Sequence, residues 1–320
     1  MDPQYLNSDR IAALLPMQEC ISVMEEMFRS IAKGGSFQPL RSLAWLKDRS
    51  GLLGMMPGFA EEAGMMGIKV ISVFPANRDS GLPSHQGVVV LFETRHGKPV
   101  LILDAAEITA IRTAAASALA TRLLARENAA ILSILGSGEQ AARHIEAIRL
   151  VREINGINCW SRNHRNAEEF SETMAQRYEL PVRVFCNARE AVAEADIICT
   201  VTSSREPILM GDWIPAGSHI NAVGACTPAY RELDTLAIVK SKLYTDCYES
   251  LFQEAGDFLT PRAEGAVIDS FVKGNLAELL TGKRKGRENG EEITLFKSLG
   301  IALEDLFSAA HIYDKLKQEG

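Results

Sequence analysis

The sequence lacks the features of several protein classes. None of its apolar stretches approaches the ~20 residues that span a bilayer, and Met1 to Tyr5 has neither the basic start nor the apolar core of a secretory signal. The net charge of -7 argues against nucleic acid as a partner, because phosphate backbones select basic surfaces. We therefore expect a cytoplasmic protein that binds neither membrane nor nucleic acid.

Cysteine and histidine are few and scattered. The six cysteines form no C-x-x-C pair, and the six histidines have no paired spacing typical of metal ligands. We expect the cysteines to be reduced and mostly buried, and we predict no metal site. The sequence also lacks the G-x-S-x-G, P-loop and protein-kinase motifs.

One glycine motif is present in a favourable context. The apolar run 129–135 leads into Gly136-Ser137-Gly138-Glu139-Gln140-Ala141, and apolar residues at helical spacing follow. A strand that turns through glycine into a helix directs free N–H groups and a positive dipole end at a pyrophosphate. Residues Gly136 to Gln140 are therefore predicted to bind a dinucleotide; the alternative is a plain strand-turn-helix corner.

The residues after the next predicted strand, 156–160, indicate which dinucleotide binds. NAD sites usually offer an acidic side chain about 20 residues beyond the glycines, whereas this chain has Ser161, Arg162, Asn163 and Arg165. Arginine pairs with a 2′-phosphate that a carboxylate would repel. We predict NADP(H) as the preferred cofactor, with NAD(H) possible; alternatively, Arg162 and Arg165 belong to the solvated start of a helix.

Two patterns of elements divide the chain. Before residue 119, a predicted amphipathic helix is followed by strands without intervening helices: helix 17–33 and strands 52–57, 67–74, 87–92 and 99–103. The last two of these strands are predicted to form a hairpin across His96-Gly97. From residue 129, helical stretches separate the predicted strands 182–185, 196–201, 219–223 and 242–246.

These patterns predict an α/β protein of two domains, joined by a helix over 108–126. Residues 119–300 form a doubly wound parallel sheet of the Rossmann type, and Thr202 and Val223, near the ends of two of its strands, are predicted to contact the cofactor. Residues 1–118, completed by a last helix within 301–320, form an α+β domain for substrate binding and dimerisation.

Three cations lie within or beside apolar sequence: Arg41, Lys69 and Arg112. A buried cation is costly without a partner, and the carboxylate of a small substrate would supply one. The alternative is an internal ion pair, with Glu93 for Lys69, or with Asp104 or Glu107 for Arg112.

The chain resembles the ornithine cyclodeaminase and mu-crystallin family over nearly its full length. The resemblance is carried by six motifs, namely 81–87 (GLPSHQG), 91–93 (LFE), 103–117 (LDAAEITAIRTAAAS), 136–141 (GSGEQA), 221–224 (NAVG) and 292–300 (EITLFKSLG). It implies a homodimer formed through the N-terminal domain, and a Rossmann domain that holds the nicotinamide cofactor. It also implies that Arg41, Lys69 and Arg112 hold a substrate carboxylate, while Ser84 lines the cofactor pocket and His85 the substrate pocket.

One departure from the family pattern bears on the reaction. Cyclodeaminases carry an aspartate shortly after the Val-Gly pair, where this chain has Cys226, predicted here to contact substrate. A neutral thiol cannot hold a cationic ammonium group as a carboxylate does. Reduction of a cyclic imine requires only that the substrate carboxylate is bound, that the carbon receives a hydride and that the nitrogen receives a proton. Lys69 is the candidate proton donor.

The expected function is therefore the NAD(P)H-dependent reduction of a cyclic ketimine carboxylate. The five-membered substrate would be Δ1-pyrroline-2-carboxylate, giving L-proline, and the six-membered one Δ1-piperideine-2-carboxylate, giving L-pipecolate. Alternatives on the same scaffold are an ornithine cyclodeaminase or an alanine dehydrogenase. A different class of alternative is a non-catalytic binding protein like some mu-crystallins.

Overall fold

The computed structural model describes residues 3–319, which divide into two compact units. The first comprises Met1–Thr113 and Ile301–Gly320, and the second Ala114–Gly300. Helix α3 (Ala105–Leu124) passes from one unit to the other, and the predicted division after residue 118 lies within the same helix. In the described part of the chain, no helix is both long and apolar enough to cross a membrane.

The first unit is built on one mixed sheet with the strand order β1-β7-β6-β5-β4-β2, and β3 also pairs with β4. Strand β1 is parallel to β7, and the remaining pairs are antiparallel. The strands are β1 (Gln4–Leu6), β2 (Ser36–Phe37), β3 (Ser42–Trp45), β4 (Leu52–Ala60), β5 (Met65–Val73), β6 (His85–Glu93) and β7 (Pro99–Asp104). The predicted strands and the hairpin at His96-Gly97 are confirmed, whereas β1, β2 and β3 were not predicted.

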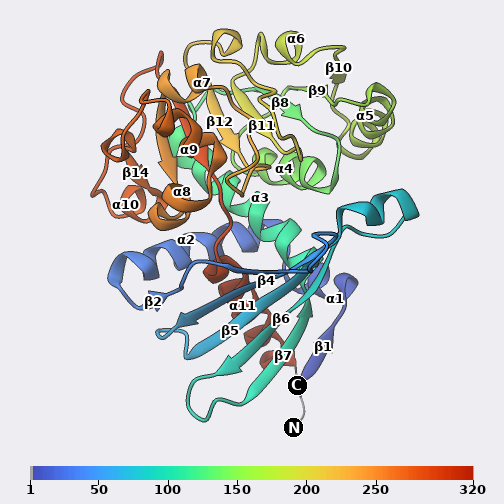
Figure 1. Cartoon of the computed structure of the whole chain (residues 1–320), viewed down its shortest axis with the longest axis vertical. Helices are drawn as coiled ribbons and strands as arrows, with labels where there is room; N and C mark the ends of the chain where they lie inside the picture. The colour runs from blue at the N-terminus through green and yellow to red at the C-terminus, as the bar shows by residue number, and fades with distance from the viewer. Residues whose placement is uncertain (1–2, 320) are drawn as a thin grey trace. The chain divides into compact units, whose positions relative to one another are not determined.

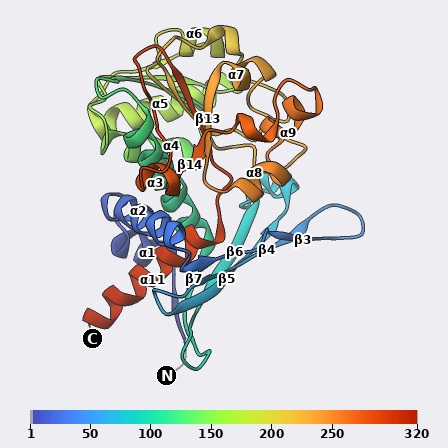
Figure 2. The ribbon, with the colours of Figure 1, turned by 90° about the vertical axis from the view of Figure 1, so that its left-hand side faces the viewer.

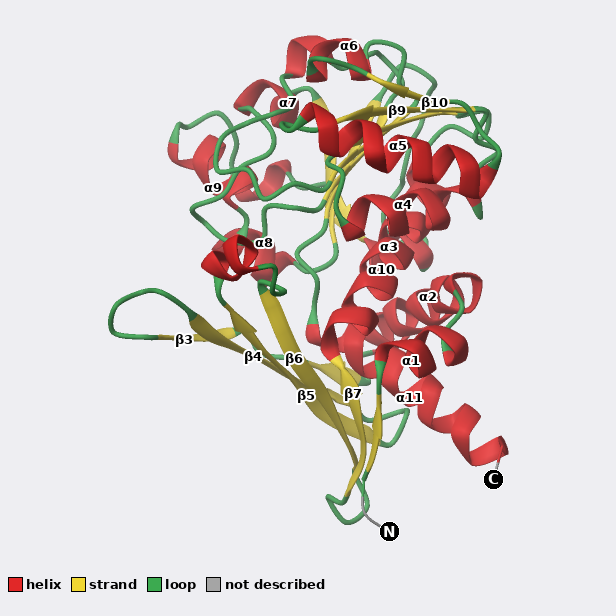
Figure 3. Cartoon of the chain, turned by 90° about the vertical axis from the view of Figure 1, so that its right-hand side faces the viewer, coloured by secondary structure: helices red, strands yellow, loops and turns green. Residues whose placement is uncertain are grey.

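Three helices cover one face of this sheet: α1 (Ser8–Leu14), α2 (Met17–Lys33) and α11 (Ala302–Glu319). Helix α11 contacts β4 to β7 and also α2, and Figure 3 shows the helices gathered on that side. The helix predicted over 17–33 is confirmed with the same bounds, and Gly34, with a φ of 83°, ends it in the left-handed conformation. The sequence pattern therefore located α2, and the last helix predicted within 301–320 is present as α11, packed beside it.

The opposite face of the sheet is apolar, yet among the described residues of this unit no helix covers it (Figure 2). Leu53 and Phe59 on β4 are 41% and 42% exposed. Aligned with them across β5 and β6 are half-buried apolar residues: Met66, Ile68, Val70, Val88, Val90 and Phe92. An uncovered apolar face of this extent is typical of an interaction surface.

The second unit is a parallel sheet in the order β10-β9-β8-β11-β12-β15-β13-β14. Its strands are β8 (Ile131–Leu135), β9 (Gly156–Trp160), β10 (Val182–Val184), β11 (Ile197–Thr200), β12 (His219–Ala222), β13 (Ser241–Thr245), β14 (Gly274–Asn275) and β15 (Ile293–Lys297). The intervening helices lie on both faces (Figure 1): α4 (Glu139–Arg149), α5 (His164–Tyr178), α6 (Ala188–Val192), α7 (Thr235–Val239), α8 (Tyr248–Glu254), α9 (Gly256–Ala263) and α10 (Leu276–Leu280). The predicted α/β fold with a doubly wound sheet is confirmed.

The order of this sheet departs from chain order where β15 inserts between β12 and β13. Sequence reasoning quoted residues 292–300 only as a motif and did not assign the strand. The five residues of β15 are almost all buried, with Leu295 and Phe296 fully so. A short buried strand has no alternation to reveal it, which explains the omission.

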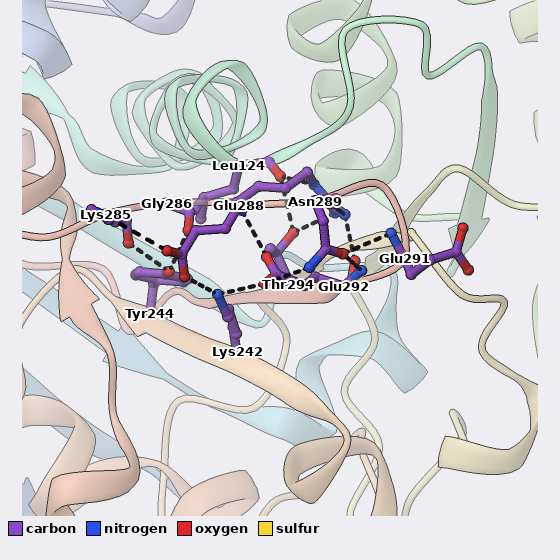
Figure 4. Close-up of polar contacts among 11 residues, drawn as sticks. Leu124, Lys242, Tyr244, Lys285, Gly286, Glu288, Asn289, Glu291, Glu292 and Thr294 are labelled. Carbon is purple, nitrogen blue, oxygen red and sulfur yellow. Dashed lines mark hydrogen bonds and ion pairs between the residues drawn. The ribbon is translucent and has the colours of Figure 1, made fainter.

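The loop before β15 is fixed to the sheet through Arg287 and through the acids Glu288 and Glu292. Arg287 donates to the carbonyls of Leu124 and Ser218 at 2.8 and 3.0 Å. Figure 4 shows Lys242 on β13 pairing with Glu288 at 2.7 Å and Glu292 at 2.6 Å. These contacts hold the loop before β15 against the amino ends of the strands.

Candidate functional site

The glycine motif forms a tight turn between β8 and α4 in the second unit. Gly136 has a φ of 131°, and a Cβ there would lie 3.0 Å from the carbonyl oxygen of Val201. Gly138 is the N-cap of α4 and provides no side-chain cap. Ala141 N donates to Gly138 O at 3.0 Å, so the N–H groups left to bind an anion are those at the very start of α4.

Two further features of this turn fit a polar ligand that carries both an anionic group and hydrogen-bond donors, as a dinucleotide does. A Cβ built on Gly138 would meet nothing within 4 Å, so the helix start faces open space. The buried Oε1 atom of Gln140 has no hydrogen-bond partner among the described residues. An open helix start beside an unpaired amide is an arrangement that a polar ligand would complete.

The predicted 2′-phosphate residues follow β9, beside the glycine turn. Ser161 is tied to that turn, because Ser137 Oγ donates to Ser161 Oγ at 3.1 Å. Asn163 is the N-cap of α5 and accepts a hydrogen bond from Asn166 N at 3.4 Å. Arg165 pairs along the helix with Glu169 at 2.9 Å, as the solvated-helix alternative proposed, whereas no ion pair of the exposed Arg162 is found within residues 3–319.

Thr202 and Val223 lie at the carboxyl ends of adjacent strands, β11 and β12. Both are half-buried, and Val223 N donates to Thr200 O at 3.0 Å. The fully buried carboxylate of Glu232 accepts hydrogen bonds from the backbone N–H groups of Thr202 and Gly224. Glu232 is not among the residues predicted from the sequence, where it lies between Arg231 and Leu233 and no local pattern marks it.

Two of the three cations of the first unit, Lys69 and Arg112, form internal ion pairs, with acids that the sequence interpretation did not name. Lys69 on β5 and Arg112 on α3 are 2% and 3% exposed. Lys69 Nζ lies 2.7 Å from Asp305 Oδ2, and Arg112 Nε donates to Asp305 Oδ1 at 2.9 Å. Arg112 also pairs with Glu304, the neighbour of Asp305 on α11.

Two of the acids considered from the sequence as ion-pair partners, Asp104 and Glu93, make other contacts. Asp104 accepts from the N–H groups of Ala106 and Glu107, each at 3.0 Å, and so begins helix α3. Glu93 accepts from N–H groups of the hairpin turn. The acids that pair with Lys69 and Arg112 come from the far end of the chain, where Glu304 and Asp305 are adjacent in helix α11. Two adjacent acids within a largely apolar helix are the signal in the sequence that could have identified them.

Burial and neighbouring charges shift the pKa values of Lys69 and Asp305. Burial and the positive charge of Arg112 lower the pKa of Lys69 to about 8, with Arg41 adding to the effect while Asp305 opposes it. Burial disfavours ionised Asp305, but Arg112 and Lys69 outweigh it and lower the pKa of this carboxyl. Arg41, which is half-buried, therefore lies near enough to Lys69 to affect its charge.

The remaining predicted residues are Ser84 and His85 of the first unit and Cys226 of the second. Ser84 Oγ and His85 Nδ1 are hydrogen-bonded at 3.0 Å at the start of β6, where His85 is opposite Val73 of β5. Cys226 belongs to the second unit, is half-buried, and packs against its hydrophobic core. Among the described residues no His, Cys, Asp or Glu cluster is arranged to hold a metal ion.

Comparison with known proteins agrees with this arrangement. The sequence model of the ornithine cyclodeaminase/mu-crystallin family matches residues 1–320. The chain belongs to this family. It is 35% identical over 309 residues to the Delta(1)-pyrroline-2-carboxylate reductase of Bacillus thuringiensis subsp. konkukian (strain 97-27), covering 96% of this chain and 94% of the relative.

Two further members of the ornithine cyclodeaminase/mu-crystallin family are similar along their whole length. The ketimine reductase mu-crystallin of Mus musculus is 35% identical over 316 residues, which are 98% of this chain and 97% of the mouse protein. The structure of Thermococcus litoralis Delta(1)-pyrroline-2-carboxylate reductase in complex with NADH and L-proline matches with a TM-score of 0.96 and 36% identity. That match covers 99% of this chain and 98% of the other.

Proposed function

We propose that this family member is an NAD(P)H-dependent ketimine reductase that converts Δ1-pyrroline-2-carboxylate to L-proline and also accepts Δ1-piperideine-2-carboxylate. The proposal is supported by the full-length similarity to reductases of cyclic imines. The observation that carries it is the buried pair of cations, Lys69 and Arg112, held side by side on Asp305, with Arg41 close enough to lower the pKa of Lys69. Adjacent cationic donors suit the carboxylate of a small substrate.

In this proposal the residues of the cluster divide the work. Arg112 and Arg41 hold the substrate carboxylate through charge-assisted hydrogen bonds. Lys69, whose pKa is lowered to about 8, donates a proton to the ring nitrogen. When bound, the reduced nicotinamide supplies the hydride that the imine carbon accepts. Asp305 keeps Lys69 and Arg112 side by side through its two oxygens.

The cofactor is proposed to bind at the carboxyl edge of the parallel sheet. Its pyrophosphate lies on the turn Gly136–Gln140, with the nicotinamide half toward Thr202 and Val223. Ser161, Arg162 and Asn163 receive the 2′-phosphate of NADPH, the preferred form, and NADH remains usable. The exposed guanidinium of Arg162 supports this preference, since its neighbour Arg165 is already paired.

The proposal also assigns the other predicted residues. Ser84 contacts the cofactor, and His85 and Cys226 contact the substrate. A thiol at position 226 does not hold an ammonium group, which argues against the cyclodeaminase reaction.

We further propose a homodimer formed by the first unit, which binds substrate, while the second unit binds the cofactor. The occupant of the uncovered apolar face of β4, β5 and β6 is then a second copy of the same face. Twofold pairing of an apolar sheet surface is a common, self-complementary form of interface.

The test is a spectrophotometric assay of NADPH and NADH oxidation with freshly prepared five- and six-membered ring imines. Ammonia release from L-ornithine, and NADH oxidation with pyruvate plus ammonia, are measured beside it. We expect oxidation with the ring imines and the faster rate with NADPH. Ammonia release without net cofactor consumption, or activity with pyruvate alone, would replace the proposal by the cyclodeaminase or the alanine dehydrogenase. Bound cofactor that no substrate oxidises would favour a binding protein.

A further inference from the structure

A single buried carboxylate joins two loops at the carboxyl edge of the second unit. Glu232 Oε1 accepts from Thr202 N at 2.6 Å and Thr202 Oγ1 at 2.7 Å. Glu232 Oε2 accepts from Thr200 Oγ1 at 2.8 Å and Gly224 N at 2.7 Å. Each oxygen thus takes one backbone N–H and one hydroxyl, and the four donors come from the ends of β11 and β12.

The backbone of Glu232 is held in place by a second buried carboxylate, that of Asp257. Asp257 Oδ1 accepts from Glu232 N at 2.8 Å and from Leu233 N at 3.0 Å. Lys297, at the end of β15, lies 3.4 Å from Asp257 Oδ2 and donates to Ala222 O at 3.0 Å. Glu232, Asp257 and Lys297 are all at most 1% exposed, so the network is sealed from solvent.

The two loops approach each other too closely for a side chain to lie between them. A Cβ on Gly224 would lie 2.0 Å from Thr202 O and 2.6 Å from Glu232 Oε1. The spacing between residues 202 and 224 is therefore set by the glutamate that both loops bind. A buried network that satisfies this many donors holds its members rigidly.

The position of these loops indicates what the spacing serves. The chain runs from β8 outward to β10 and then returns to β11 on the other side of β8, so the switch point of the sheet lies between β8 and β11. A dinucleotide crosses the sheet at this point, with one half beyond β8, β9 and β10 and the other beyond β11 and β12. The glycine turn fixes the adenosine side, which leaves the nicotinamide half to the loops that Glu232 joins.

We infer that Glu232 is a positioning residue for the nicotinamide half of the cofactor, acting through Thr202 and Gly224 without touching the cofactor itself. The inference rests on the proposed function, because it requires a nicotinamide dinucleotide at this edge. It assigns no role to Glu232 in binding the adenosine half.

The decisive experiment compares the whole cofactor with its fragment that lacks nicotinamide. The affinities of Glu232→Gln and of the wild type are measured for NADH and ADP-ribose, or for NADPH and 2′-phospho-ADP-ribose if the wild type prefers those. The amide NH2 of glutamine cannot accept, so one backbone N–H at residue 202 or 224 loses its acceptor. We expect the Kd of the whole cofactor to rise about tenfold and that of the fragment to stay within about twofold.

Asp196→Asn is the matched control at the opposite end of β11. Asp196 Oδ2 accepts from the N–H groups of Ala130 and Ile131 at 2.8 and 2.9 Å, at the amino edge of the same sheet. We expect this variant to lower the thermal unfolding temperature without changing the ratio of the two Kd values. Thr200→Val, which removes one buried donor to Glu232, should raise the Kd of the whole cofactor by a smaller factor, about threefold.

Thr200→Val decides the question if Glu232→Gln does not fold. Equal weakening of cofactor and fragment, or no change in either, would overturn the inference and leave the proposed function standing. A wild-type protein that binds neither molecule would remove the proposed function, and this inference with it.

Discussion

At the scale of single residues, the molecule is organised around charges buried with their partners. Burial of a charged side chain is unfavourable by itself. Asp305 and Glu304 compensate for the burial of Lys69 and Arg112 by forming ion pairs with them. The remaining capacity of these cations, together with Arg41, is what the proposed substrate carboxylate uses. Three predictions test this assignment and that of the cofactor.

Replacing Arg112 by alanine should lower kcat/KM for the ring imine at least about tenfold, mainly through KM. The change removes charge-assisted hydrogen bonds to the carboxylate, each of which contributes ~1.5–3 kcal/mol. Steady-state kinetics measure it, and thermal unfolding separates the loss from instability, since Glu304 and Asp305 lose their partner. Arg112→Lys keeps the positive charge but not the two parallel N–H donors of the guanidinium, and its kcat/KM should lie between those of the wild type and Arg112→Ala. A kcat/KM for Arg112→Ala within about twofold of wild type would refute the assignment.

The pH profile tests Lys69 as proton donor. Because the pKa of Lys69 is lowered to about 8, the donating form is lost above that pH, and kcat/KM should fall about tenfold per pH unit there. The charged groups facing it are Asp305 on α11, Arg112 on α3 and Arg41.

Asp305→Asn supplies the control for this profile. Asp305 favours the protonated lysine, so its neutralisation should lower the pKa of Lys69 further and move the falling limb to lower pH. The substrate's own titration does not depend on the variant. A limb at the same pH in both proteins would therefore assign it to the imine rather than to Lys69.

Cofactor choice is tested at Arg162. Arg162→Ala should raise KM for NADPH at least about tenfold and leave KM for NADH within about twofold, because only NADPH carries the 2′-phosphate. Arg165→Ala is the matched control, since Arg165 is engaged with Glu169. An equal change in KM for NADPH and for NADH in Arg162→Ala would mean that this guanidinium does not bind the 2′-phosphate.

At the scale of elements, helix α11 lies against the sheet of the first unit at positions that have no side chain. A Cβ on Gly67 would lie 2.4 Å from Val90 O and 2.7 Å from Leu306 Cδ2. At Gly58 the nearest atom is Leu306 Cδ1, at 3.0 Å. The glycines of β4 and β5 thus let α11 approach closely enough for its acids to reach Lys69 and Arg112.

Gly67→Ala should lower the free energy of unfolding by about 1–3 kcal/mol, since the added methyl group would clash with the carbonyl oxygen of Val90 on β6 and with Leu306 on α11. Denaturant unfolding measures the change. Gly290→Ala serves as control, because a Cβ there meets nothing within 4 Å, and should stay within about 0.5 kcal/mol. Equal stability of the two variants would mean that the contact with α11 adapts without cost.

At the scale of the whole molecule, the uncovered apolar face of β4, β5 and β6 is the feature that a single chain leaves unexplained. Ile68 and Val90 are directly opposite each other at its centre. Burial of such a face against its copy would remove a large apolar area from water, which is the main favourable contribution to association.

Ile68→Glu should convert the dimer to a monomer, because each of the two copies would bury a charge in the apolar contact. Sedimentation equilibrium measures the mass. Ile268→Glu is the matched control at an isoleucine that is 67% exposed in the second unit, and should leave the mass unchanged. A wild-type monomer, or a dimer that survives Ile68→Glu, would exclude this face as the interface.

The sequence by itself determined the elements with clear local signals. The glycine turn, the alternation of strands and helices after residue 129, helix 17–33 and the hairpin at Gly97 follow from periodicity and turn residues, and all are present in the structure. The sequence also identified the family, because it contains several motifs of the ornithine cyclodeaminase/mu-crystallin family along nearly its whole length. Such features depend on residues close in sequence.

Only the tertiary structure decided which partners the buried charges have. Lys69 and Arg112 pair with acids of the C-terminal helix, and Glu232 joins the ends of two strands that are separate in the chain. It also decided the insertion of β15 between β12 and β13. The physical reason is that a charge inside a core selects whichever opposite charge the fold brings within reach, and local sequence carries no information on which distant segment that is.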